Sequence, residues 1–69
     1  MRIDGWTLVV EETGDEVNKG DALKTFRGEA AVLEGGRPPH HVGSSGKVYT
    51  DLGVHYPSVY GLEWVNASL

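Results

Sequence analysis

A chain of 69 residues without cysteine can form one small domain, and it excludes disulfide bonds, thiolate metal sites and cysteine nucleophiles. Its formal net charge of −4 argues against strong non-specific binding to nucleic acid, because neutralising phosphates requires clustered Lys and Arg. No apolar run approaches the ~20 residues of a membrane span, and the N-terminus lacks the apolar stretch of a signal peptide. Since small secreted domains usually carry disulfides, we expect a single domain over residues 1–69 in the cytoplasm.

Charge is unevenly distributed along the chain. Residues 1–21 carry six carboxylates and two basic side chains, whereas residues 22–50 carry four basic side chains and two carboxylates. The acidic part is most simply a solvated hairpin. Its alternative role is to dock on a basic protein surface or to mimic nucleic acid, through Glu11, Glu12, Asp15 and Glu16.

Ten glycines divide the chain into short segments. Frequent turn residues between short apolar segments are typical of a β-sandwich or a β-barrel. The first segment, residues 6–11, alternates in hydrophobicity, with Trp6, Leu8 and Val10 on one face. This alternation predicts a half-buried strand.

The next stretch combines turn residues with short apolar segments. Turns are expected at 13–16 and 18–21, because Gly and Asp favour tight turns, with a short return strand between them. Residues 23–27 and 29–34 then form two strands, or one long strand that bends at Gly28. A helix is the alternative here, and the glycine with the β-branched and aromatic residues around it disfavours that alternative.

Residues 35–46 are expected to form a loop. Pro38 and Pro39 cannot donate hydrogen bonds to a sheet, and four glycines and two serines make the rest of the segment pliable. A loop of 12 residues is long for a connection in a compact domain, and such loops are often functional or disordered.

A hairpin follows the loop, with strands at 47–50 and 54–56. Residues 57–61 form a single helical turn closed by glycine, and residues 62–65 form the last short strand. The residues expected in the core are Trp6, Leu8, Val10, Leu23, Phe26, Val32, Val48, Tyr56, Val59, Leu62 and Trp64.

A meander of short strands with a one-turn helix at Pro57-Ser58-Val59-Tyr60 resembles an SH3-like small barrel. In that fold a short 3₁₀ turn with a Pro-Ser motif precedes the final strand. The resemblance implies an all-β domain, a small SH3-like barrel of five or six short strands with a one-turn 3₁₀ helix before the last one. The acidic, aromatic-rich loop of peptide-binding SH3 domains is not recognisable in this sequence.

Four short motifs resemble those of small uncharacterised proteins encoded by tailed bacteriophages. The motifs are Phe26-Arg27-Gly28-Glu29, Gly36-Arg37-Pro38-Pro39-His40, Gly43-Ser44-Ser45-Gly46-Lys47-Val48-Tyr49 and Tyr56-Pro57-Ser58-Val59. The similarity covers about residues 17–65. It implies a phage or prophage origin and carries no established activity, since fold analogy does not give function.

The long loop and the strand after it form a candidate binding patch. Consecutive backbone amides in glycine turns can hold an anion, and basic side chains add positive charge. Aromatic rings beside basic groups bind single-stranded nucleic acid by stacking. The patch consists of Arg37, His40, His41, Ser44, Ser45, Lys47 and Tyr49. The simpler alternative is a solvated loop whose neighbouring rings pack on the core.

The segment Gly43-Ser44-Ser45-Gly46-Lys47 has only a superficial similarity to a P-loop. The P-loop motif requires a further glycine where this chain has His41, and Ser or Thr where Val48 follows the lysine. It also requires a strand–loop–helix unit, and a strand is expected after this loop. Nucleotide hydrolysis is therefore not expected.

Other catalytic and metal sites are not expected either. His40 and His41 are adjacent, so in an extended chain they point to opposite sides and do not easily share one ion. A triad assembled from Ser44, His41 and Asp51 lacks a nucleophile elbow, and so short a chain leaves little scaffold for a water-excluded pocket. We expect neither an enzyme nor a cofactor.

The remaining function class is binding. We expect a small non-enzymatic protein-interaction module that binds a larger protein, which is a host protein if the phage resemblance holds. One alternative is a nucleic-acid-binding small barrel that uses the loop and strand over residues 37–49. The other is a minor structural component of a phage particle. The oligomeric state stays open, because an edge strand of a small sheet can pair with a second copy.

Overall fold

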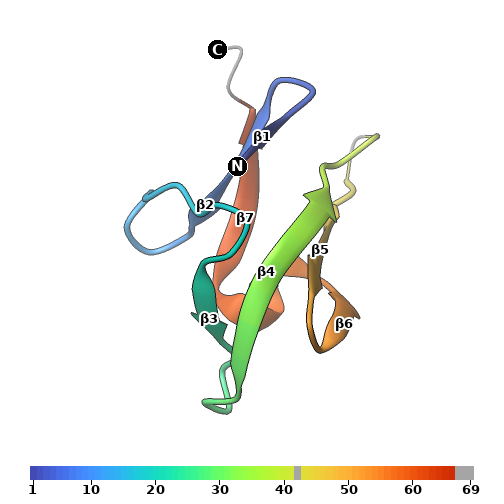
Figure 1. Ribbon diagram of the computed structural model, residues 1–69. Coiled ribbons are helices and arrows are strands. Elements are labelled where there is room, and N and C mark those ends of the chain that lie inside the picture. The colour runs from blue at the N-terminus through green and yellow to red at the C-terminus, as the bar shows by residue number, and fades with distance from the viewer. Residues whose placement is uncertain (42, 67–69) are drawn as a thin grey trace.

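The computed structural model describes residues 1–41 and 43–66. In these residues seven β-strands form two antiparallel sheets, and one short segment forms a 3₁₀ helix (Figure 1). This confirms the all-β expectation. The elements in chain order are β1 (Arg2–Ile3), β2 (Trp6–Val10), β3 (Ala22–Lys24), β4 (Ala30–Arg37), β5 (Lys47–Thr50), β6 (Gly53–His55), η1 (Pro57–Tyr60) and β7 (Leu62–Asn66).

The first sheet has the strand order β1-β2-β7, so the beginning of the described chain pairs with its end. Leu8 of β2 lies opposite Trp64 of β7, and both side chains are buried. The expected return strand after β2 is reduced to an isolated bridge between Val9 and Glu16. The segment between β2 and β3 is therefore a loop rather than a hairpin arm.

The short strand β1 pairs with β2 through a tight turn. Ile3 lies opposite Trp6, so Asp4 and Gly5 form the turn. Both have positive φ, 52° and 82°, which is the backbone of a type I′ hairpin turn. Asp-Gly is a strong hairpin signal that the sequence interpretation missed, and β1 is the strand beyond the five or six expected.

The second sheet is a meander with the order β3-β4-β5-β6. Gly28 has φ of 84° and lies in the turn between β3 and β4, so the two-strand alternative for this stretch is the correct one. Strand β4 continues through Gly35 and Gly36, which we had assigned to the loop. A Cβ on Gly36 would lie 2.8 Å from Cζ2 of Trp64, so a glycine lets the strand pack against this ring.

Helix η1 forms the expected single turn before the last strand. Gly61 closes it with φ of 68°, and its amide donates to the carbonyl of Ser58 at 3.1 Å. The positive φ at Gly61 is the left-handed backbone that commonly ends a helix. Throughout the described part of the chain, no helix has the length and apolar character needed to cross a membrane.

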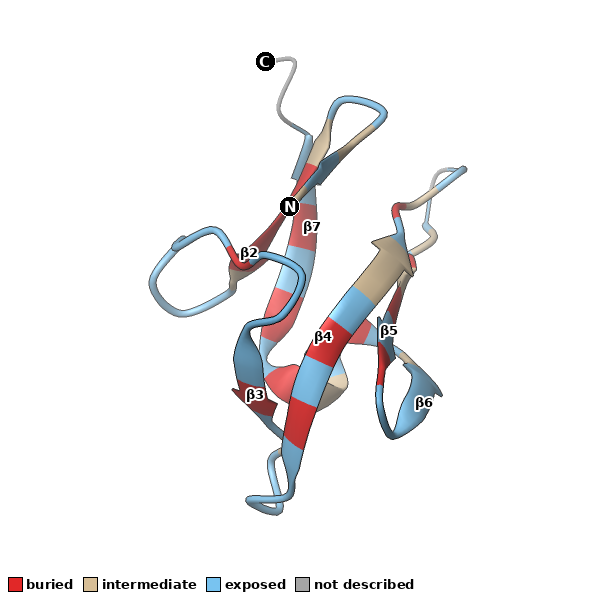
Figure 2. Cartoon of the chain, in the orientation of Figure 1, coloured by how far each residue is buried: buried red, intermediate tan, exposed pale blue. Residues whose placement is uncertain are grey.

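The core lies between the two sheets, and Figure 2 shows buried and exposed residues alternating along β4. Leu8, Leu33 and Val48 are its largest fully buried side chains. The whole buried cluster is Leu8, Val17, Leu23, Ala31, Leu33, Val48, Tyr60, Leu62 and Trp64, with Trp6, Val10 and Val59 half-buried at its margin.

Three residues expected in the core are exposed, which corrects the prediction. The exposed fractions are 79% for Phe26, 41% for Val32 and 56% for Tyr56. Val32 points outward because its neighbours Ala31 and Leu33 occupy the inward positions of β4. Phe26 and Tyr56 lie outside the strands, in the turn after β3 and directly after β6.

Candidate binding sites

The register of the second sheet places two basic residues and an aromatic residue in one row. Arg37 of β4 lies directly opposite Lys47 of β5, so the two side chains share one face of the sheet. On the other side of Lys47 is Tyr56, and Nζ of Lys47 lies 3.4 Å from the centroid of its ring. This distance is a close cation–π contact. We call Arg37, Lys47 and Tyr56 the basic–aromatic row.

A second row lies on the same face, one step along the strands. Tyr49 is two residues beyond Lys47 on β5, and Val54 of β6 lies opposite it. A Cβ on Gly35 would lie 3.4 Å from Cδ2 of Tyr49, so the tyrosine ring is in contact range of the glycine. Val48 and Thr50 alternate with them along β5 and are buried, so Lys47 and Tyr49 face outward.

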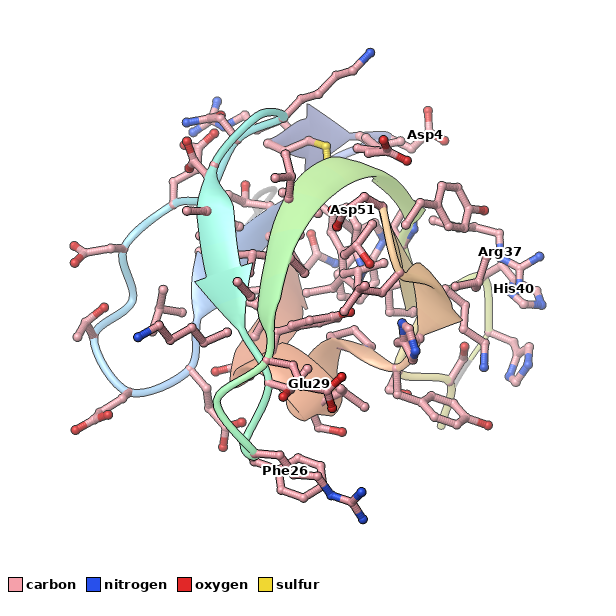
Figure 3. The ribbon with its side chains drawn as sticks, turned by 60° about the horizontal axis from the view of Figure 1, so that its bottom comes forward. Asp4, Phe26, Glu29, Arg37, His40 and Asp51 are labelled. Atoms are coloured by element: carbon pink, nitrogen blue, oxygen red, sulfur yellow. The ribbon has the colours of Figure 1, made fainter. Side chains whose placement is uncertain are left out.

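Next to the basic–aromatic row lies a hollow of about 250 Å³ at the base of the long loop. Its walls are Arg37, His40, Gly43, Ser44, Ser45, Gly46, Lys47 and Tyr56, and we call it the loop hollow. None of these lining residues is acidic. Figure 3 shows Arg37 and His40 projecting from the same side of the molecule.

The structure brings together five residues of the patch that the sequence predicted: Arg37, His40, Ser44, Ser45 and Lys47. His41 lies in an adjoining recess with Trp6 and Pro39, and Tyr49 lies on the sheet face beside the hollow. The described part of the loop covers 38–41 and 43–46, and Val42 lies outside the described residues. The lining also includes Gly43 and Gly46 of the loop, and Tyr56, a side chain that sequence reasoning missed because its hydrophobicity assigns it to the core.

The two adjacent histidines are in contact, although we expected them to point apart. The ring centroids of His40 and His41 are 4.5 Å apart at an interplanar angle of 83°. The opposite-sides argument assumed an extended chain, and the backbone bends at His41. In the described ranges, no three His, Asp or Glu side chains gather into a set that could bind a metal ion.

Core packing holds the loop base in place. A Cβ on Gly46 would lie 2.6 Å from the carbonyl oxygen of Arg37, so the two segments approach as closely as a glycine permits. The indole Nε1 of Trp64 donates to the carbonyl of Lys47 at 3.2 Å. The amide of Gly46 donates to Oγ of Ser44 at 3.3 Å. The hollow therefore has a defined base next to the core.

A second candidate site surrounds Phe26, which the sequence interpretation had placed in the core. The turn that carries it is held by the side chain of Thr25, whose Oγ1 accepts from the amides of Arg27 at 3.3 Å and Glu29 at 3.1 Å. The amide of Phe26 donates to the carbonyl of Val59 at 3.2 Å, which ties the turn to η1. The ring of Phe26 thus projects into solvent from a fixed backbone.

Beside Phe26 is an apolar cleft of about 370 Å³. Thr25, Phe26, Arg27, Glu29, Leu52, His55, Val59 and Tyr60 line it, and we call it the Phe26 cleft. The guanidinium carbon of Arg27 lies 5.6 Å from the centroid of the Phe26 ring, at the rim. In Figure 3, Phe26 extends at the bottom of the view, and Glu29 lies above it.

A hydrogen-bonded chain orients His55 in the cleft. The hydroxyl of Tyr60 lies 3.1 Å from Nδ1 of His55 and 3.0 Å from Oγ1 of Thr50. The hydroxyl of Thr50 in turn donates to the carbonyl of Gly53 at 3.3 Å. The ring of His55 is therefore held by a hydroxyl that is itself hydrogen-bonded within the core.

Carboxylates border the Phe26 cleft. Glu29 is part of its lining, and Tyr60 also lines an adjoining recess that contains Glu11 and Glu12. Arg27 is the one cation among the lining residues of these two hollows. The lining of the cleft and of this recess therefore carries more carboxylates than basic side chains, whereas the lining of the loop hollow carries no carboxylate.

The acidic loop after β2 is tied to the start of the chain. The carboxylate of Glu16 accepts a hydrogen bond of 2.7 Å from the N-terminal ammonium of Met1, which also donates to the carbonyl of Val17. The hydrogen bond from this ammonium lowers the pKa of Glu16 below its ordinary value. Nearby positive charge, including that of Arg2, adds to the effect.

A scan against protein-family models and searches of curated proteins and of solved structures found no match to this chain.

Proposed function

We propose that this chain is a small protein-interaction module that binds its partner at the Phe26 cleft. The observation that carries the proposal is the 79% exposure of Phe26 beside an apolar cleft of about 370 Å³. Leaving a phenylalanine in water forgoes about 1.5–3 kcal/mol of burial energy. A partner that covers this ring recovers that energy on binding.

The way Phe26 is held supports a role in binding. Its backbone is fixed by hydrogen bonds to Val59 and within the turn that begins at Thr25. A ring on a preordered backbone loses little conformational entropy when a partner covers it. Aromatic side chains of this kind commonly dominate the energy of protein interfaces.

The charges near the cleft favour one kind of partner. Glu29 lines the cleft, and Glu11 and Glu12 line the recess on the other side of Tyr60. A partner segment that inserts an apolar side chain and carries Lys or Arg beside it complements both features. We therefore propose a basic, apolar segment of a larger protein as the ligand.

The element order supports a more specific description of the fold. Strand β2 pairs with β7, the strands β4, β5 and β6 form a meander, and η1 precedes β7. This is the order of an SH3-like barrel, and we propose that the two sheets are a small member of that architecture. If the resemblance to phage proteins reflects origin, the partner is a protein of the bacterial host, met in its cytoplasm.

The experiment compares affinity capture by three tagged proteins: the unaltered chain, Phe26→Ser and Val65→Ser. Val65 is an exposed apolar residue of β7, away from the Phe26 cleft, so its variant controls for non-specific binding to exposed apolar side chains. The bait is incubated with nuclease-treated bacterial lysate, and each recovered protein is identified and tested again in pure form. A purified partner that binds the unaltered chain and Val65→Ser, but not Phe26→Ser, supports the proposal. Equal recovery by all three baits contradicts it.

A further inference from the structure

We propose that the basic–aromatic row and the loop hollow form a second site, which binds single-stranded nucleic acid. This site shares no lining residue with the Phe26 cleft, so the inference goes beyond the proposed function and does not depend on it.

The charge at this site is opposite to that of the chain as a whole. The net charge is −4, yet Arg37 and Lys47 lie side by side and His40 lines the same hollow. None of the described residues that line the hollow is a carboxylate. Glu11 and Glu63 line an adjoining hollow on the far side of Ser44 and Ser45, so the favourable surface for phosphates is the part next to Arg37 and Lys47. Basic side chains grouped there attract phosphates, whereas the acidic remainder of the surface repels them.

Two tyrosines on this face supply rings for stacking. Tyr49 lies opposite Val54, and Tyr56 is two residues further along, so the tyrosines are diagonal neighbours across adjacent strands. Side chains in that relation are about 7–8 Å apart. Tyr56 keeps 56% of its surface exposed although Lys47 contacts its ring. Two exposed rings at this spacing can each stack on a base of an extended strand.

The arrangement fits the alternation of bases and phosphates. Lys47 lies between Arg37 and Tyr56 in the row, and Tyr49 follows it on the same face of β5. A base stacked on Tyr56 therefore has its own phosphate within reach of Lys47. The following phosphate of the strand is then within reach of Arg37. The hydroxyls of Ser44 and Ser45 line the hollow and can bond to sugar or phosphate oxygens.

The surface favours a single strand over a duplex. The row spans three neighbouring strands, which is about 10 Å. A duplex keeps its base faces stacked inside, so the two tyrosine rings would find no partner there. A single strand offers both base faces and phosphates to so short a surface.

The test is fluorescence anisotropy of labelled oligothymidine, oligouridine and a hairpin duplex, titrated with the full chain over a range of salt concentrations. We expect the single strands to bind more tightly than the duplex. The slope of log affinity against log salt should be about −1.4 to −2.1, for two or three neutralised phosphates at −0.7 each. Duplex binding as tight as single-strand binding would overturn the assignment.

Substitutions separate charge from stacking. Arg37→Gln and Lys47→Gln should each weaken binding and reduce the salt slope by about 0.7. Tyr56→Ala should weaken binding about 5- to 150-fold, whereas Tyr56→Phe, which keeps the ring, should not. Lys24→Gln removes an exposed lysine of the same sheet outside the row, and it should leave affinity unchanged.

Two further results decide the matter. If Tyr56→Ala binds like the unaltered chain and heparin competes as well as oligothymidine, the site is a general polyanion surface and the inference fails. Phe26→Ser should bind oligonucleotides like the unaltered chain. A failure of the nucleic-acid site and a failure of the proposed protein interaction are therefore distinguishable. Far-UV circular dichroism of each variant establishes that the fold is retained.

Discussion

The phenolic oxygen of Tyr60 lies 3.1 Å from Nδ1 of His55, and the two rings meet edge to face with centroids 5.7 Å apart. Tyr60 is buried in the core, whereas His55 is half-buried and lines the Phe26 cleft. The contact therefore links the core directly to the site. Core packing thus sets the orientation of the His55 ring in the cleft.

Replacing Tyr60 by Phe tests this link. Oγ1 of Thr50 still accepts from the amide of Leu52 at 3.1 Å, so no buried group is left without a partner. We expect the free energy of unfolding to fall by only about 1 kcal/mol, measured by urea denaturation. The imidazole signals of His55 should shift in NMR spectra, because its partner is gone. Tyr49→Phe removes an exposed hydroxyl and should change neither quantity.

Two glycines of the same loop should differ in their tolerance of a side chain. Gly46 and Gly43 both have positive φ, 72° and 86°. A Cβ at Gly46 would lie 2.6 Å from a backbone carbonyl, whereas a Cβ at Gly43 would meet nothing within 4 Å. Gly43→Ala should therefore lower the free energy of unfolding by only ~1 kcal/mol, because alanine is strained in a left-handed backbone. Gly46→Ala should lower it by about 3 kcal/mol, because the added Cβ also clashes. Equal losses in urea denaturation would contradict the close approach of the two segments.

Local patterns predicted most of the elements. Alternation identified β2, and Pro57 with Gly61 bounded the single helical turn. Gly28 marked the place where β3 and β4 separate, although the sequence left one long bent strand open as the alternative. The loop patch was also a local feature, since its residues are close in sequence. Five of its seven residues line one hollow because β4 and β5 bring both ends of the loop together.

The parts that could not be predicted depend on contacts between distant segments. Gly35 and Gly36 are loop-forming residues in isolation, and they extend β4 because Trp64 of the last strand packs on Gly36. Hydrophobicity alone assigned Phe26 and Tyr56 to the core. Their exposure follows from a turn anchored to Val59 and from the end of β6, and neither is visible in a local pattern.

Phe26→Ser should leave stability nearly unchanged. The ring is 79% exposed, and the hydrogen bonds that hold its turn come from the backbone and from Thr25. We expect the free energy of unfolding to change by less than about 0.5 kcal/mol. Leu33→Ala, at a fully buried position of β4, should cost about 2–5 kcal/mol in the same urea experiment. A large loss for Phe26→Ser would mean that the ring stabilises the fold rather than serving a partner.

The hydrogen bond between Glu16 and the N-terminal ammonium should make stability depend on pH. It lowers the pKa of Glu16 in the folded chain, so the folded state binds fewer protons than the unfolded state between the two pKa values. The contribution is fully present above the unfolded value of about 4.3, and it is lost as pH falls through the lowered folded value. In Glu16→Gln this part of the acid sensitivity should be missing when urea denaturation is followed from neutral to acidic pH. Glu12→Gln removes a carboxylate from the same loop without breaking this hydrogen bond, so it should keep the pH dependence. If the two variants lose stability on acidification in parallel with the unaltered chain, the ammonium contact contributes nothing in solution.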